Sequence, residues 1–227
     1  MGINELDVLR WLHILAMVYW LGGEWGVFQA SYNVINRDLP MAERRRHMET
    51  AYRIDILART GIILLLPLGL HMGSLLYMHD YGGSWLVIMW LLFAAWLSLT
   101  WMAFVKRETD AGIRLTKIDE AIRFVVIPLL LIASISSLLG HGPFLAGAGN
   151  NWFATKLLIY ALLLVIGLKL RFVMREWTVL FRRLATEGDS PQIEAVLDKS
   201  IRQARMLAYV YWVGIASVAF LGATKAL

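Results

Sequence analysis

The stretch that decides the fold is residues 56–78, ILARTGIILLLPLGLHMGSLLYM, in which Arg59 is the single Lys, Arg, Asp or Glu. A helix that crosses the hydrocarbon core of a bilayer needs about 20 mostly apolar residues. Five more stretches of this kind follow or precede it. The six predicted spans are residues 6–32, 56–78, 84–105, 121–142, 151–172 and 206–223. We therefore predict an all-α, polytopic membrane bundle that forms one domain over residues 1–227.

The composition agrees with lipid as the solvent of this chain. Apolar residues make up 59% of it, against roughly 45–50% in soluble domains. The net charge is +5, but the basic residues lie between apolar runs, so binding to nucleic acid is not expected. Cysteine is absent, which excludes disulfides, thiolate metal sites and covalent c-type haem attachment.

The basic residues predict the orientation. Three connecting segments are long and charged, and they and the adjoining helix ends hold all but three of the 22 Lys and Arg residues, namely Arg10, Lys156 and Lys225. By the positive-inside rule the charged segments face the cytoplasm and both termini face outward. We expect a bacterial inner membrane, with cytoplasmic helical extensions over residues 36–55 and 173–205.

Two histidines are predicted to share a level inside the membrane. With a rise of about 1.5 Å per residue, His13 and His71 each lie about 10 Å from the outer end of their helices. Such a pair commonly holds a b-type haem, so both are candidate axial ligands. Arg10, Lys156 and His141 would shape the outer pocket. The alternative is that each histidine only joins neighbouring helices by hydrogen bonds.

A second set of candidate ligands overlaps the first. His71, Met72, Met78 and His79 bracket the outer end of the second span. Imidazole and thioether ligands suit copper, so this set is an alternative metal site.

At the other end, Glu24 is the only carboxylate well inside a predicted span. Arg59 lies at a similar level at the start of the next span. A Glu24–Arg59 pair would neutralise both charges, because ionisable groups inside lipid need a partner or a function.

Three short motifs resemble one family of membrane proteins. Leu12-His13-Ile14 with Val18–Gly22, Leu57-Ala58-Arg59, and Trp152–Lys156 are similar to patterns in the HemJ-type protoporphyrinogen IX oxidases and the related CopD-type copper-resistance proteins. The resemblance implies a b-type haem held by His13 and Lys156, with Arg59 as a supporting polar residue. It also implies that residues 84–142 are an inserted helical hairpin.

The two lines of reasoning differ over the second ligand. A lysine ligates iron only when it is neutral, whereas a histidine needs no such change. We therefore favour His13 with His71 and keep Lys156 as the alternative ligand or as a propionate partner.

The sequence supports three hypotheses. The first is a haem-b membrane redox protein that exchanges electrons with a quinone, a porphyrin compound or another membrane redox subunit. The second is copper transport or handling, and the third is a non-catalytic subunit of a larger membrane complex. Catalysis, the number of haems and the oligomeric state stay open.

Overall fold

A computed structural model describes residues 2–107, 109–145, 151–188 and 190–226. Within these ranges the chain forms six α-helices and no strand, which confirms the all-α prediction. The helices are α1 (Glu5–Val34), α2 (Met41–Leu75), α3 (Ser84–Val105), α4 (Asp110–Leu138), α5 (Asn151–Glu187) and α6 (Pro191–Thr224).

Local capping explains where several helices begin. The Asn4 side chain accepts a hydrogen bond from the Asp7 amide at 2.9 Å, and the Asp7 carboxylate accepts one from the Asn4 amide at 3.3 Å. This reciprocal pair is a capping box. The Thr109 hydroxyl caps α4, and Pro191 opens α6 at the first helical position, where its missing N–H costs nothing.

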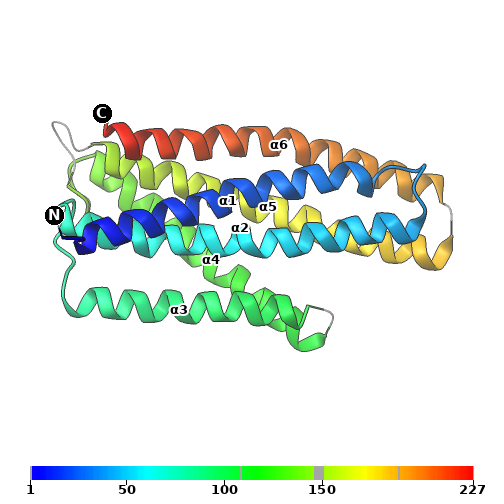
Figure 1. The fold of residues 1–227 in the computed structure, drawn as a ribbon, viewed down its shortest axis with the longest axis horizontal. Coiled ribbons are helices and arrows are strands. Elements are labelled where there is room, and N and C mark those ends of the chain that lie inside the picture. Colours follow the sequence, from blue (N-terminus) through cyan, green and yellow to red (C-terminus); the bar gives the residue numbers. More distant parts are fainter. Residues whose placement is uncertain (1, 108, 146–150, 189, 227) are drawn as a thin grey trace.

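Four helices form one long bundle, and two lie partly outside it (Figure 1). Helix α1 packs against α2, and α5 against α6. Helix α3 lies at the edge, and α4 connects it to α5. Both termini lie at the same end of the bundle (Figure 1). We call this end the termini end and the other the opposite end.

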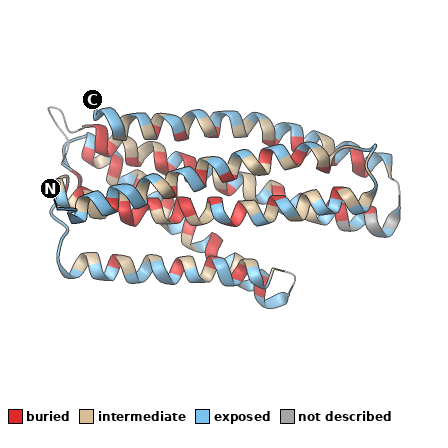
Figure 2. Cartoon of the chain, in the orientation of Figure 1, coloured by how far each residue is buried: buried red, intermediate tan, exposed pale blue. Residues whose placement is uncertain are grey.

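Helix α2 is the central helix. In the most apolar 18-residue stretch of α2, 61% of the residues are buried inside the protein, against 22% in that of α3. Figure 2 shows the same contrast. Glycines allow α1 and α2 to approach closely, because a Cβ at Gly61 would collide with the Ala16 carbonyl and the Trp20 amide. This close contact fixes which face of α1 turns inward.

Five helices, α2–α6, are long and apolar enough to cross a membrane. Helix α1 has the length but not the apolarity, because it carries His13, Glu24 and a Gly22-Gly23 pair in its middle. The predicted span of residues 84–105 has the same bounds as α3. Helix α2 ends three residues before the predicted end at 78, and α4 ends four residues before the predicted end at 142.

The charged segments at the opposite end are mostly helical. Helix α2 begins at Met41, α5 continues to Glu187 and α6 starts at Pro191. Their ends enclose a second apolar core that includes Trp177, Leu197 and Ile201. Beside it, buried Arg44 and Glu194 form a two-pronged ion pair with N–O distances of 2.5 and 2.9 Å. These extensions are therefore a packed part of the fold.

Candidate functional site

A cavity of about 610 Å³ lies between α1, α2, α5 and α6 at the termini end. This volume is in the range of roughly 300–1,000 Å³ that is usual for small-molecule and cofactor sites. The side chains around it are mostly aliphatic and aromatic, with a few basic groups. Its lining includes Arg10, His13, Met17 and Trp20 from α1, Leu66, Gly69, Met72 and Gly73 from α2, Phe153, Lys156 and Tyr160 from α5, and Val218, Ala219 and Gly222 from α6.

His13 is the principal polar group of the cavity wall. Its ring packs against α2 at Gly69, where an added Cβ would lie 3.4 Å from the imidazole Cε1. The Nδ1 atom is buried and has no hydrogen-bond partner. Buried polar atoms are normally satisfied, and each exception calls for an explanation. His13 is therefore a cavity-lining residue with one unsatisfied ring nitrogen, which marks it as the candidate to hold a metal or a polar ligand.

The charged side chains of the cavity are all basic. Arg10, Lys156 and Lys225 line it, and no Asp or Glu occurs among its described lining residues. Lys156 reaches across to Gly222 on α6, which has no side chain to obstruct it. Lys225 lies over the Trp152 ring at 5.9 Å. Arg10 is 3.7 Å from Asp7, and both side chains are about half exposed. The cavity is thus suited to an anionic or carboxylate-bearing ligand.

The aromatic residues of the wall satisfy their own polar atoms. The Trp20 indole N–H donates to the Tyr211 hydroxyl at 3.0 Å, and the Tyr160 hydroxyl donates to the Ile62 carbonyl at 2.6 Å. The Trp20 and Tyr160 rings pack edge to face with centroids 6.0 Å apart, and both line the cavity, so their apolar bodies suit an apolar ligand.

His71 does not join His13 at the cavity. Its Nε2 is 3.2 Å from the Glu5 carboxylate, and its Nδ1 accepts the Trp90 indole N–H at 3.3 Å. His71 is also absent from the lining residues. The two histidines thus contact different neighbours.

The residues of the predicted copper set lie in separate surroundings. Met72 lines the cavity, Met78 packs against the main core, and His71 faces Glu5 and Trp90. His79 is buried, with Nε2 at 2.9 Å from the Leu70 carbonyl and Nδ1 accepting the Tyr81 amide. Among the described residues, no group of three or more His, Asp and Glu could hold a metal ion.

Two further predicted site residues lie elsewhere. His141 is exposed, follows the end of α4 and is not a lining residue. Arg59 is ion-paired with Asp55, one turn earlier on α2, and the predicted partner Glu24 also lies within electrostatic reach of Arg59. Arg59 lies at mid-length of α2 and is not a lining residue of the cavity.

The middle of the bundle holds a buried charge network that the sequence reasoning missed. Asp119 is fully buried and accepts hydrogen bonds at 2.8 Å from the Trp96 indole and the Thr100 hydroxyl. It is also ion-paired with Arg123, at 3.2 Å, and with Arg171. Glu120 pairs with Arg171 and Arg175. The predicted span began at residue 121, so both carboxylates were assigned to a charged cytoplasmic segment outside the membrane.

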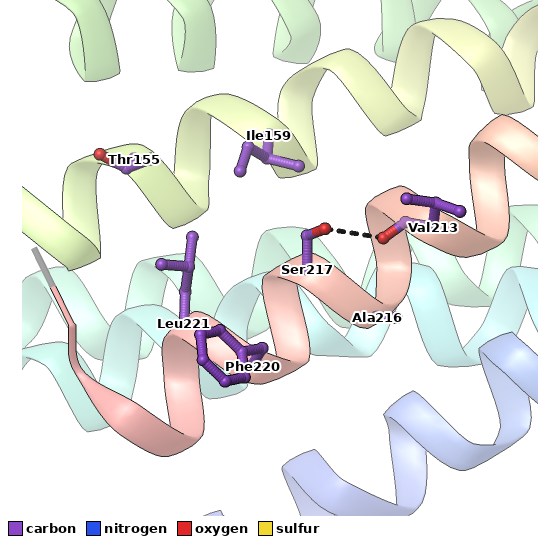
Figure 3. A pocket seen from close by; sticks show the side chains of 7 residues that line it. All are labelled: Thr155, Ile159, Val213, Ala216, Ser217, Phe220 and Leu221. Carbon is purple, nitrogen blue, oxygen red and sulfur yellow. Dashed lines mark hydrogen bonds between the residues drawn. The ribbon is translucent and has the colours of Figure 1, made fainter.

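A second, shallow depression between α5 and α6 is apolar (Figure 3). Its one drawn hydrogen bond is internal to α6, where the Ser217 hydroxyl donates to the Val213 carbonyl at 2.8 Å. The depression has no charged side chain, so the His13 cavity is the better candidate site.

Sequence reasoning also missed Trp20, Tyr160 and Lys225 as cavity residues. A usable signal was present for Trp20, because Arg10, His13, Met17 and Trp20 recur at three- and four-residue spacing and therefore share one helix face. No comparable signal was present for Lys225, which follows the end of α6.

No protein-family model matches the chain, and neither the curated proteins nor the solved structures contain a match.

Proposed function

We propose that this chain is a haem-b-binding redox protein of the membrane, with His13 as an axial ligand. The observation that carries the proposal is the buried Nδ1 of His13, which lacks a hydrogen-bond partner at a cavity lined by basic and aromatic side chains. A neutral imidazole is a common axial ligand of haem iron. The resemblance of residues 12–14 and 152–156 to the HemJ and CopD families supports the same assignment.

The residues present fit such a group. Trp20, Tyr160 and Phe153 offer ring surfaces to a flat macrocycle, and Arg10, Lys156 and Lys225 could pair with its two carboxylates. A haem bound there would supply one-electron redox chemistry. The chain itself would position it, exclude water from its faces and neutralise its negative charge.

Lys156 would be better placed than His71 to act as the second ligand, and in that case Arg10 and Lys225 alone would pair with the two carboxylates. Lys156 lines the same cavity as His13, whereas both ring nitrogens of His71 already have partners in Glu5 and Trp90. Met72, another lining residue, is the next candidate for the second ligand, through its thioether sulfur. This choice reverses our preference from the sequence and agrees with the family resemblance.

We further propose that α1 is a sixth span and that the termini end faces outward from a bacterial inner membrane. Helix α1 packs along the central helix α2 over the level of the apolar spans. Most of the 22 Lys and Arg residues lie toward the opposite end, which the positive-inside rule assigns to the cytoplasm. An amino-terminal tag detected inside the cell would contradict this orientation.

The direct test is an absorption spectrum of the detergent-purified protein. We expect a reduced-minus-oxidised spectrum of b type that His13→Ala abolishes. His141→Ala is the matched control, because this exposed histidine lies outside the cavity and its loss should leave the spectrum unchanged. His71→Ala should also retain bound haem, with at most a small spectral shift.

Other outcomes would favour the other hypotheses. Copper without porphyrin, found by metal analysis, would replace the haem proposal with copper handling. A colourless, metal-free protein that co-purifies with other membrane proteins would favour a non-catalytic subunit. A spectrum that survives His13→Ala would overturn the assignment of the ligand.

A further inference from the structure

The exposed residues among the described lining of the cavity all lie on one side of it. Four lining residues are exposed: Arg10 and Ile14 on α1, and Ala223 and Lys225 at the end of α6. All described lining residues of α2 and α5 are buried or half-buried. The opening, which we call the α1–α6 mouth, therefore lies between the outer parts of these two helices.

The α1–α6 mouth faces lipid. Trp11, Ile14 and Val18 share one face of α1 and are 59%, 52% and 54% exposed. On α6, Phe220 is 62% exposed one turn before Ala223. Large apolar side chains exposed in a row are expected where a membrane helix contacts acyl chains.

The side of the cavity near the α2–α3 connection is closed by aromatic packing. His79 is 2% exposed, and its ring centroid lies 5.8 to 6.2 Å from those of Trp85, Phe144 and Phe153. The Leu145 amide donates to the Met78 carbonyl at 2.8 Å, which ties the two connecting segments together. We call these packed rings the aromatic cap.

We propose that ligands enter the cavity sideways from the membrane through the α1–α6 mouth, and that the mouth favours amphipathic anions with a flat apolar body. The apolar rim admits the body, while Arg10 and Lys225 at the outer end of the rim attract the acidic group. The route rests on the shape of the cavity and on the proposed placement of α1 in the membrane. The identity of the ligand as haem rests on the proposed function.

The first test needs no haem and uses the absence of cysteine from the chain. A single cysteine is introduced as Met17→Cys, inside the cavity, in protein reconstituted into liposomes. We expect a lipid-soluble maleimide to label it at least tenfold faster than a sulfonated, water-soluble one. Ala219→Trp, which adds bulk at the α6 side of the cavity, should slow this labelling at least fivefold.

Two matched variants separate the route from general effects. Ala216→Trp places the same bulk on α6 outside the cavity and should leave the labelling of Met17→Cys unchanged. Val18→Cys, on the lipid face, should be labelled at the same rate with or without Ala219→Trp. If the sulfonated reagent labels Met17→Cys equally fast, and Phe144→Ala in the aromatic cap rather than Ala219→Trp changes the rate, entry is from water and the proposal is wrong.

Closing the mouth after folding avoids any folding defect of Ala219→Trp. In Ile14→Cys/Ala223→Cys, a flexible bis-maleimide can join the two sides of the rim. Haemin supplied in liposomes should then bind at least fivefold more slowly than to the same protein treated with a mono-maleimide. Arg10→Gln/Lys225→Gln should slow haemin but not haemin dimethyl ester, and equal slowing of both would refute the selection of anions.

The failure of this proposal and that of the proposed function can be told apart. If Met17→Cys shows the expected labelling but haemin never binds, the lateral route holds and the haem assignment falls. If haemin binds at an unchanged rate with the mouth cross-linked, the haem assignment holds and the lateral route falls.

Discussion

Two regions of the bundle treat buried charge in opposite ways. In the middle of the bundle, Asp119 and Glu120 are surrounded by Arg123, Arg171 and Arg175, so acidic and basic groups neutralise one another inside the protein. At the termini end, the cavity has basic side chains, an unpartnered imidazole nitrogen and no acidic group among its described lining residues. The first arrangement is complete without a ligand, whereas the second lacks an anion for its basic groups and a partner for its histidine nitrogen.

This difference shows which buried polar residues to regard as functional. Ionisable groups within membrane helices are costly, and each is expected to have a partner or a purpose. A paired network such as that around Asp119 explains itself as structure. An unpaired set such as that around His13 does not, and the cost of burying it is offset once a ligand binds.

The largest effect is expected from removing the acidic centre of the paired network. Asp119→Ala leaves Arg123 and Arg171 buried without their shared partner, and breaking a buried ion pair costs about 3–5 kcal/mol. We expect a marked loss of folded protein in detergent, seen as a lower Tm by tryptophan fluorescence and as aggregation by size exclusion. Asp119→Asn should be milder, because an amide oxygen still accepts from Trp96 and Thr100.

Asp198→Ala is the matched control for that prediction. It also removes one partner of an ion pair, with Arg202 at 2.8 Å, but the Arg202 side chain is 72% exposed. Exposed pairs contribute about 0–1 kcal/mol. If Asp119→Ala were no more destabilising than Asp198→Ala, the paired network around Asp119 would not stabilise the fold.

The sequence was sufficient to predict where the helices lie along the chain, but not how each helix is rotated about its own axis. Apolar length located residues 56–78 as part of α2, and rise per residue put His13 and His71 at one level. Which way each side chain points depends on rotation about the helix axis, about 100° per residue. On α2 the cavity face includes Gly69, Met72 and Gly73, and His71 lies roughly 200° beyond Gly69. The bis-His pair failed on this angle.

The prediction from sequence missed the paired network around Asp119 for a different reason. Asp119 and Glu120 belong to a stretch with many charges, so hydropathy assigned them to a charged segment outside the membrane. Their burial depends on two other helices, since Trp96 and Thr100 come from α3 and Arg171 and Arg175 from α5. Charge pairing between residues about 50 positions apart leaves no local pattern in a single sequence.

The next largest effect is expected from comparing two histidines of the same end. His79→Leu removes the partner of the Leu70 carbonyl and of the Tyr81 amide, and leaving buried polar groups unsatisfied costs about 1–3 kcal/mol each. His13→Leu removes an imidazole whose Nδ1 has no partner, so the ligand-free protein should be equally stable or slightly more stable. Thermal unfolding of the two variants beside the wild type measures the difference.

Equal destabilisation by the two substitutions would show that His13 is as much a structural residue as His79. It would remove the main reason for regarding the cavity as unsatisfied. A stable His13→Leu protein that no longer binds haemin would instead assign the residue to function alone.

The smallest effect concerns the pH dependence of stability. His79 lies in the connection between α2 and α3, and burial lowers the pKa of its imidazole below the ordinary value of 6.5. The unfolded chain therefore takes up a proton at this residue before the folded protein does, so acidification favours unfolding. The stabilisation by neutral His79 is complete above about pH 7.5 and declines as the pH falls through about 6.5. Between pH 7.5 and 5.5 the decline is at most about 1.4 kcal/mol.

This decline should appear as a difference between the wild type and His79→Leu in thermal unfolding at the two pH values. Because other groups titrate equally in both proteins, parallel pH profiles would mean that His79 is not held neutral by the aromatic cap.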